Sequence, residues 1–67
     1  MSLHEKLARE IGRVSLLLAE YRSLRVNPEL LQQTIFAIEH KLEAAKLASG
    51  GDETAMRQAI ADLEEFL

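Results

Sequence analysis

Few side chains in this sequence have the types and spacing that metal binding or catalysis requires. His4 and Glu5 begin like the zinc-protease pattern H-E-x-x-H, but Ala8 stands where the second histidine ligand would be. The sequence contains no cysteine, which excludes disulfide bonds and zinc–thiolate sites. We therefore interpret Glu5 as part of a helix cap and expect no metal at this end of the chain.

A second polar group surrounds His40, with Glu39 before the histidine and Glu43 after it. Di-iron helical bundles use the pattern Glu-x-x-His, and Ala37 occupies the place of that glutamate. An enzyme also needs acids, bases or nucleophiles held in a pocket, for which a helical chain of 67 residues has little room. The sequence predicts a solvated polar face here, and a protein that is not an enzyme and uses no cofactor.

The composition predicts a folded, all-α protein. Hydrophobic residues make up 48% of the chain and the net charge is only −3, so the chain lacks the low hydrophobicity and high charge of disordered segments. Leucine and alanine, which are among the commonest residues of the chain, are good helix formers. Apolar runs such as residues 16–19 are far shorter than a membrane span, and residues 1–6 lack the apolar stretch of a secretory signal. We therefore expect a cytoplasmic protein without a membrane partner.

Apolar residues recur at helical spacing along three segments, about residues 3–24, 28–49 and 53–66. The second segment has the most regular seam, with steps of four and three between Leu31, Ile35, Ile38, Leu42 and Ala45. The linkers between segments are short, which places successive helices antiparallel to each other. The predicted fold is a single helical domain over residues 1–67, an antiparallel helical hairpin with a shorter third helix in a three-helix up-down-up arrangement.

Capping residues mark the expected ends of these helices. Three residues are predicted N-caps: Ser2, Asn27 and Asp52. Ser2 and Glu5 have the spacing of a capping box, in which each side chain binds the backbone amide of the other. At the other end of the second helix, Gly50 is expected to take the left-handed conformation that commonly ends a helix.

The third predicted helix is too short to cover the whole hairpin. At about 1.5 Å per residue it is roughly 22 Å long, against roughly 33 Å for each of the other two. Apolar residues near the turn at Asn27 then lack a third wall, and a contiguous patch of this kind usually marks an interface. We expect a protein partner to bind there, or a symmetric dimer to form in its absence, through Leu17, Tyr21, Leu24, Leu30 and Leu31.

Two more apolar residues, Phe36 and Leu47, lie on the side of the second predicted helix opposite its seam. One interpretation is that the third helix covers Leu47 and that a single exposed apolar side chain is ordinary. The other interpretation is that Phe36 and Leu47 form a second contact surface for another chain. Both residues are therefore candidate partner-binding residues.

Charge is distributed unevenly along the chain. Basic residues predominate over residues 1–26 and acidic residues over residues 52–67. A nucleic-acid-binding stripe is denser in basic residues and free of interspersed glutamates. We instead expect the acidic side chains of the third helix to lie near Arg9 and Arg13, and we do not expect nucleic acid as a partner. The acidic side chains meant here are Asp62, Glu64 and Glu65.

Two short stretches resemble turns of small helical-hairpin proteins of type III secretion. The sequence LRVNPELLQQ (residues 24–33) looks like the turn of that class, and SGGD (residues 49–52) is similar to the turn of its needle co-chaperones. The resemblance implies a cytoplasmic hairpin that pairs with a larger helical-repeat chaperone and keeps the needle subunit unpolymerised. The third predicted helix departs from a plain hairpin. We predict a non-enzymatic helical protein–protein interaction module; the alternative is a small regulatory or nucleic-acid-associated helical protein.

Overall fold

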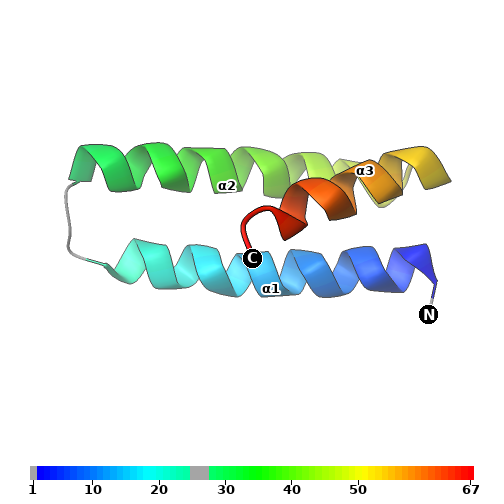
Figure 1. The fold of residues 1–67 in the computed structure, drawn as a ribbon, viewed down its shortest axis with the longest axis horizontal. Helices are drawn as coiled ribbons and strands as arrows, with labels where there is room; N and C mark the ends of the chain where they lie inside the picture. The colour runs from blue at the N-terminus through cyan, green and yellow to red at the C-terminus, as the bar shows by residue number, and fades with distance from the viewer. Residues whose placement is uncertain (1, 25–27) are drawn as a thin grey trace.

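Three α-helices make up the described part of the chain, residues 2–24 and 28–67 of a computed structural model. They are α1 (Leu3–Ser23), α2 (Pro28–Ala48) and α3 (Glu53–Glu64). Figure 1 shows α1 and α2 as an antiparallel hairpin, with α3 running back along it. Each helix contacts both of the others. These features confirm the predicted all-α, up-down-up arrangement with a shorter third helix.

Two of the three predicted N-caps are present, and the third, Asn27, lies outside the described residues. The Ser2 hydroxyl accepts a hydrogen bond from the Glu5 amide at 3.1 Å, which begins α1. The Asp52 carboxylate accepts one from the Ala55 amide at 2.8 Å, which begins α3. Each bond satisfies an amide that the first turn of a helix leaves without a backbone partner.

The end of α2 differs from the prediction. No glycine of the chain has a positive φ, so the expected left-handed conformation of Gly50 is wrong. Instead, the Gly50 amide donates to the Leu47 carbonyl at 3.2 Å and the Gly51 amide to the Ala48 carbonyl at 2.9 Å. These tighter bonds satisfy the last carbonyls of α2 without a left-handed residue. A side chain at Gly51 would meet the Ala48 carbonyl and the Ala55 Cβ, each at 3.3 Å, because the chain reverses closely there.

The hydrophobic core lies between all three helices. It consists of nine buried residues, three from each helix: Leu7, Val14 and Leu18; Ile38, Leu42 and Ala45; and Ala59, Ile60 and Leu63. Ile38 and Leu42 belong to the predicted seam of α2 and are almost fully shielded from solvent. Because α3 supplies a third of the core, the core is concentrated where α3 covers the hairpin.

Candidate interaction surface

α3 covers only part of the hairpin. It has 12 residues, whereas α1 and α2 have 21 each. At about 1.5 Å per residue, α3 is roughly 18 Å long and each hairpin helix roughly 32 Å. In Figure 1, α3 starts near the N-terminal end of α1, and the chain ends near the middle of the hairpin. The half of the hairpin where α1 ends and α2 begins therefore has no third helix on the side that α3 occupies.

One line of residues on α1 shows this change of environment. Leu3, Glu10, Leu17 and Leu24 are spaced seven apart, so they point in nearly the same direction from the helix. Leu3 lines a hollow together with Ile60 of α3, and Glu10 is only 4% exposed. Leu17 is half-buried, and Leu24 is 46% exposed. The first residues of this line are therefore covered by α3, and the last is exposed to solvent.

The corresponding line on α2 is Thr34, Lys41 and Ala48. Lys41 faces α3, because its Nζ lies 3.5 Å from Asp62 Oδ2. Thr34 is two turns earlier on the same line, and Leu30 is one turn before Thr34. The Thr34 hydroxyl donates to the Leu30 carbonyl at 3.2 Å, so this polar group is satisfied within α2. The α2 side of the uncovered half therefore presents mainly apolar surface.

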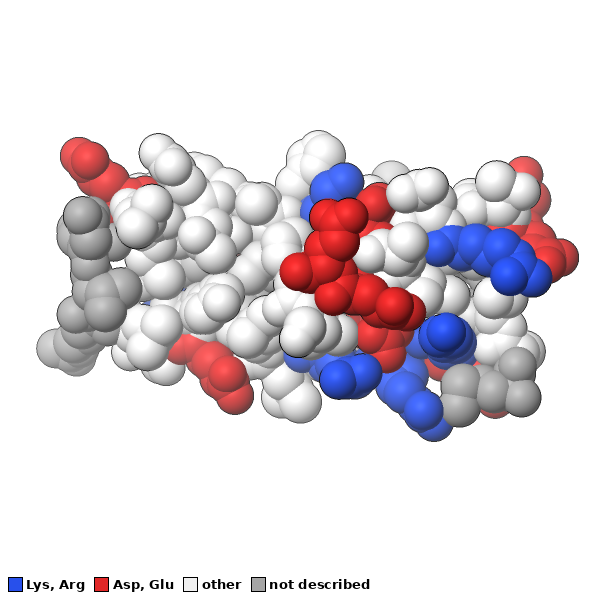
Figure 2. Space-filling view, viewed as in Figure 1, with Lys and Arg blue, Asp and Glu red and all other residues white. Residues whose placement is uncertain are grey.

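We call the apolar surface of this uncovered half, on the side of the hairpin that α3 occupies, the open face. The structure places all five residues predicted near the turn at or beside it: Leu24 and Leu30 are exposed, while Leu17, Tyr21 and Leu31 are half-buried. With Thr34 added, the open face consists of Leu17, Tyr21, Leu24, Leu30, Leu31 and Thr34, none of them charged. Figure 2 shows this half as a nearly white area with acidic side chains only at its edges.

Phe36 and Leu47 lie elsewhere, on the outer side of α2. They are 59% and 76% exposed, so the expectation that α3 covers Leu47 is wrong. Leu47 follows the buried Leu42 by five residues, which turns it roughly 140° away around the helix. Eleven residues also separate Phe36 from Leu47, which is roughly 16 Å along α2. The structure therefore does not bring these two residues together with the open face.

Two exposed leucines, Leu16 and Leu67, were not among the predicted partner-binding residues. Leu16 points away from the core and lines a shallow hollow with Leu17 and Leu67, where the end of α3 meets α1. The sequence indicated an exposed leucine here, because residues 16–18 are all leucine and three consecutive positions of a helix cannot all face the core. Leu16 extends the apolar surface around the edge of α1.

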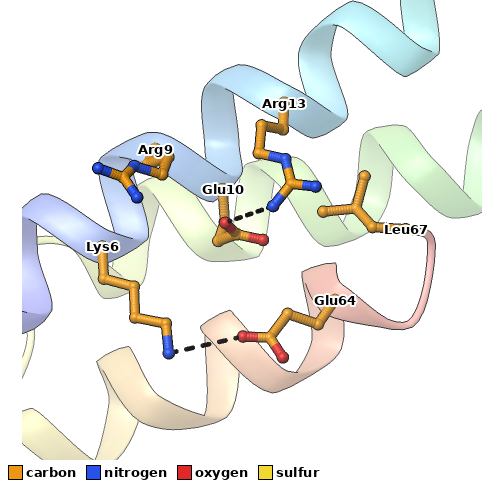
Figure 3. Close-up of a pocket in the computed structure, with 6 residues that line it drawn as sticks. All are labelled: Lys6, Arg9, Glu10, Arg13, Glu64 and Leu67. Carbon is orange, nitrogen blue, oxygen red and sulfur yellow. Dashed lines mark hydrogen bonds and ion pairs between the residues drawn. The ribbon is translucent and has the colours of Figure 1, made fainter.

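Basic side chains of α1 gather in an open pocket beside the end of α3, with a volume of about 620 Å³ (Figure 3). Lys6 Nζ lies 3.9 Å from Glu64 Oε1, and this pair joins α1 to α3. Arg13 donates instead to Glu10 of its own helix, at 3.2 Å. The prediction that acidic α3 residues lie near Arg9 and Arg13 holds for Glu64, which lines the same pocket, but Lys6 makes the ion pair.

Glu10 was not identified as a buried residue from the sequence. Its carboxylate lies under the end of α3 and is held by the Arg13 guanidinium. The spacing of Glu10 from Leu7 and Val14, three and four residues, places it on the apolar stripe. A glutamate on such a stripe is ordinarily read as solvated, and only the position of α3 decides that it is covered.

The described ranges 2–24 and 28–67 contain no group of three His, Cys, Asp or Glu side chains that could hold a metal ion. Within the same ranges, every helix is too short or too polar to cross a membrane. No protein-family model matches the chain, and neither a curated protein nor a solved structure matches it. The surfaces of the molecule are therefore the basis on which a function is proposed.

Proposed function

We propose that this chain is a non-enzymatic helical module that binds other protein chains through the open face. The observation that carries the proposal is that α3 ends about halfway along the hairpin, and the six residues of the open face on the uncovered part are all uncharged. Contiguous apolar surface of this kind is typical of protein interfaces.

Burial of the open face is physically favourable. Removing apolar surface from water stabilises a complex by about 25 cal/mol per Å². No charged side chain of the open face would have to lose its water, and the Thr34 hydroxyl already has a partner. α3 illustrates the geometry, because it lies on the same side of the hairpin with apolar residues spaced three and four apart. A partner helix with that spacing suits the rest of the same surface.

The cellular role that we propose for this module is that of a cytoplasmic chaperone partner in type III secretion. Support comes from the turn-like stretches at residues 24–33 and 49–52, which resemble those of the needle co-chaperones. In that role the module pairs with a larger helical-repeat chaperone. The small size of the chain and its hairpin of two long helices suit such a pairing.

Capture from an extract of the source cells, followed by mass spectrometry, tests the proposal when matched variants are compared. We expect the wild-type chain to retain a partner that the variants Leu24→Glu and Leu31→Glu lose. The control variants Phe36→Gln and Leu47→Gln alter exposed apolar residues away from the open face and should retain it. A partner that is lost with the control variants but kept by Leu24→Glu would contradict the proposal.

A small regulatory or nucleic-acid-associated protein is the second candidate, and its nucleic-acid form is favoured by the three basic side chains Lys6, Arg9 and Arg13 around one open pocket. Glu10 and Glu64 line the same pocket and offset two of these charges. Phosphate-driven binding weakens steeply with salt, so a retardation assay at low and moderate salt separates the two candidates. Retardation that disappears with salt and with Arg9→Ala would favour this role.

A further inference from the structure

We propose that the seam between α1 and the end of α3 binds a small amphipathic anion, which is a single apolar chain that carries one phosphate or carboxylate group. Two hollows form this site: the basic pocket of about 620 Å³ and the shallow hollow of about 270 Å³ beside Leu16. Arg13 and Leu67 line both hollows, so the two adjoin and one ligand can span them. The site goes beyond the proposed function, because Leu17 is the one residue that it shares with the open face.

The basic pocket offers a cation that the protein itself does not neutralise. Lys6 and Arg13 have carboxylate partners, Glu64 at 3.9 Å and Glu10 at 3.2 Å. Arg9 lines the same pocket, is exposed, and forms no ion pair or hydrogen bond with residues 2–24 or 28–67. Three cations therefore face two carboxylates, and one guanidinium group is left for a ligand. A guanidinium group binds phosphate or carboxylate oxygens through parallel N–H donors.

A second cation of the pocket is held in position before a ligand binds. The buried Glu10 carboxylate accepts a hydrogen bond from Arg13 Nη1 at 3.2 Å, and this bond orients the guanidinium group. It uses one of the five N–H donors of an arginine, so Arg13 keeps donors for a ligand. Figure 3 shows Arg13 beside Leu67, where the basic pocket meets the shallow hollow. Groups that are fixed in advance lower the entropic cost of binding.

The shallow hollow supplies the apolar surface for the chain of the ligand. Leu16 and Leu67 are exposed there, and burying them against an alkyl chain removes apolar surface from water. Arg9 and Leu16 are seven residues apart, roughly 10 Å along α1, which is within the reach of a short alkyl chain. Glu20 lines the far side of the hollow and repels an anion. The charged group of the ligand therefore lies toward Arg9 and its apolar chain toward Leu16.

Octyl phosphate is the probe for this site, used below the concentration at which it forms micelles. Amide NMR shifts of the full chain measure its binding, and we expect a dissociation constant of about 1 mM for a ligand of about 13 non-hydrogen atoms. The largest shifts should fall on residues 6–17 and on the end of α3. Inorganic phosphate and octanol carry only the charged group or only the chain, and each should bind at least about tenfold more weakly. Equal binding of octanol, or shifts confined to the open face, would overturn the proposal.

Matched variants separate the two ends of the site. Arg9→Ala and Leu16→Gln should each raise the dissociation constant of octyl phosphate about fivefold. Arg22→Ala and Leu47→Gln replace an exposed arginine and an exposed leucine elsewhere, so they should leave it within about twofold of the wild-type value. All four side chains are exposed, and circular dichroism melts verify that each variant is folded. Unchanged binding by Arg9→Ala or by Leu16→Gln would overturn the proposal.

Glu64→Gln provides a test of the opposite sign. This change removes the carboxylate that pairs with Lys6, so octyl phosphate should bind about twofold to fivefold more tightly. Weaker binding would contradict an anion site in this pocket. Leu24→Glu should bind octyl phosphate as the wild type does, because Leu24 lines neither hollow, although it should lose the captured protein partner. The anion site and the proposed function can therefore fail separately.

Sedimentation with anionic phospholipid vesicles distinguishes a free amphiphile from a membrane surface that displays the same group. We expect the chain to remain in the supernatant at a vesicle concentration that supplies about 1 mM lipid. Pelleting of the wild-type chain but not of Arg9→Ala, without binding of octyl phosphate, would overturn the assignment to a free molecule and place the anion on a membrane.

Discussion

At the scale of the residue, Glu10 and Arg13 show how a charge is accommodated next to the core. Glu10 is buried, and the half-exposed Arg13 guanidinium donates to its Oε1 atom at 3.2 Å. An ion pair between exposed side chains contributes about 0–1 kcal/mol. A buried acceptor that loses its partner costs about 1–3 kcal/mol, so this pair differs from the exposed ones of the same molecule.

Replacing Arg13 by alanine tests this difference. The sequence alone predicts only a slight effect, on the assumption of an exposed pair with α3. From the structure we expect Arg13→Ala to lower the free energy of unfolding by about 1–3 kcal/mol, measured by urea denaturation. Arg57→Ala is the matched control. Arg57 and Glu53 form an ion pair between exposed side chains, so this variant should lower the free energy of unfolding by less than about 1 kcal/mol. If the two variants lower the free energy of unfolding equally, Glu10 has found another hydrogen-bond partner in the absence of Arg13.

Gly12 offers a stabilising substitution. It lies inside α1 and is exposed, and apart from its chain neighbours and the adjacent backbone of α1 no atom lies within 4 Å of the position that a Cβ would take. Alanine is more favourable than glycine in a helix interior by about 1 kcal/mol. We expect Gly12→Ala to raise the free energy of unfolding by about that amount, seen as a higher midpoint in thermal melts. Gly51→Ala is the contrasting variant and should destabilise, because its Cβ would crowd Ala48 and Ala55.

At the scale of the element, α2 separates core from surface within two residues. Ile38 is fully buried in the seam, while Phe36 is exposed on the outer side. Ile38→Ala should lower the free energy of unfolding by about 2–5 kcal/mol, because it leaves a cavity. Phe36→Ala should change it by less than about 1 kcal/mol. Chemical denaturation of both variants measures the contrast, and a large cost for Phe36→Ala would show that Phe36 is buried in the dilute monomer.

The short helix α3 depends strongly on its first turn. The Asp52 carboxylate accepts the Ala55 amide at 2.8 Å, and α3 has only 12 residues over which to form further backbone bonds. Loss of an N-cap costs about 0.5–2 kcal/mol. We expect Asp52→Ala to destabilise the chain by that amount in thermal or urea unfolding. Asp52→Asn keeps a capping oxygen and should retain most of the stability; if it does not, the charge at the helix end matters more than the hydrogen bond.

At the scale of the whole molecule, stability depends on all three helices together. Each contributes three residues to one core, so a hairpin without α3 would expose Leu7, Val14 and Ile38 to water. We expect a chain that ends after Ser49 to lose the cooperative unfolding transition and much of its helical circular dichroism, since isolated helices gain most of their stability from packing. A synthetic peptide of residues 50–67 should restore both in a mixture. A truncated chain that melts cooperatively by itself would show that the hairpin is sufficient.

Local patterns in the sequence specify the number, order and approximate bounds of the helices and the all-α arrangement. These follow from local physics: apolar residues at steps of three and four, the capping side chains Ser2 and Asp52, and short linkers. The uncovered half of the hairpin was also predictable, because helix length follows from residue number. The end of α2 was mispredicted, since the bonds of Gly50 and Gly51 depend on how α3 folds back.

Which side chains α3 covers depends on how the three helices pack together. Its position buries Glu10, leaves Leu47 exposed, and assigns the ion pair with Glu64 to Lys6 rather than to Arg9 or Arg13. These outcomes depend on the angle and register at which one helix lies on two others, and helical periodicity specifies only which face each helix buries.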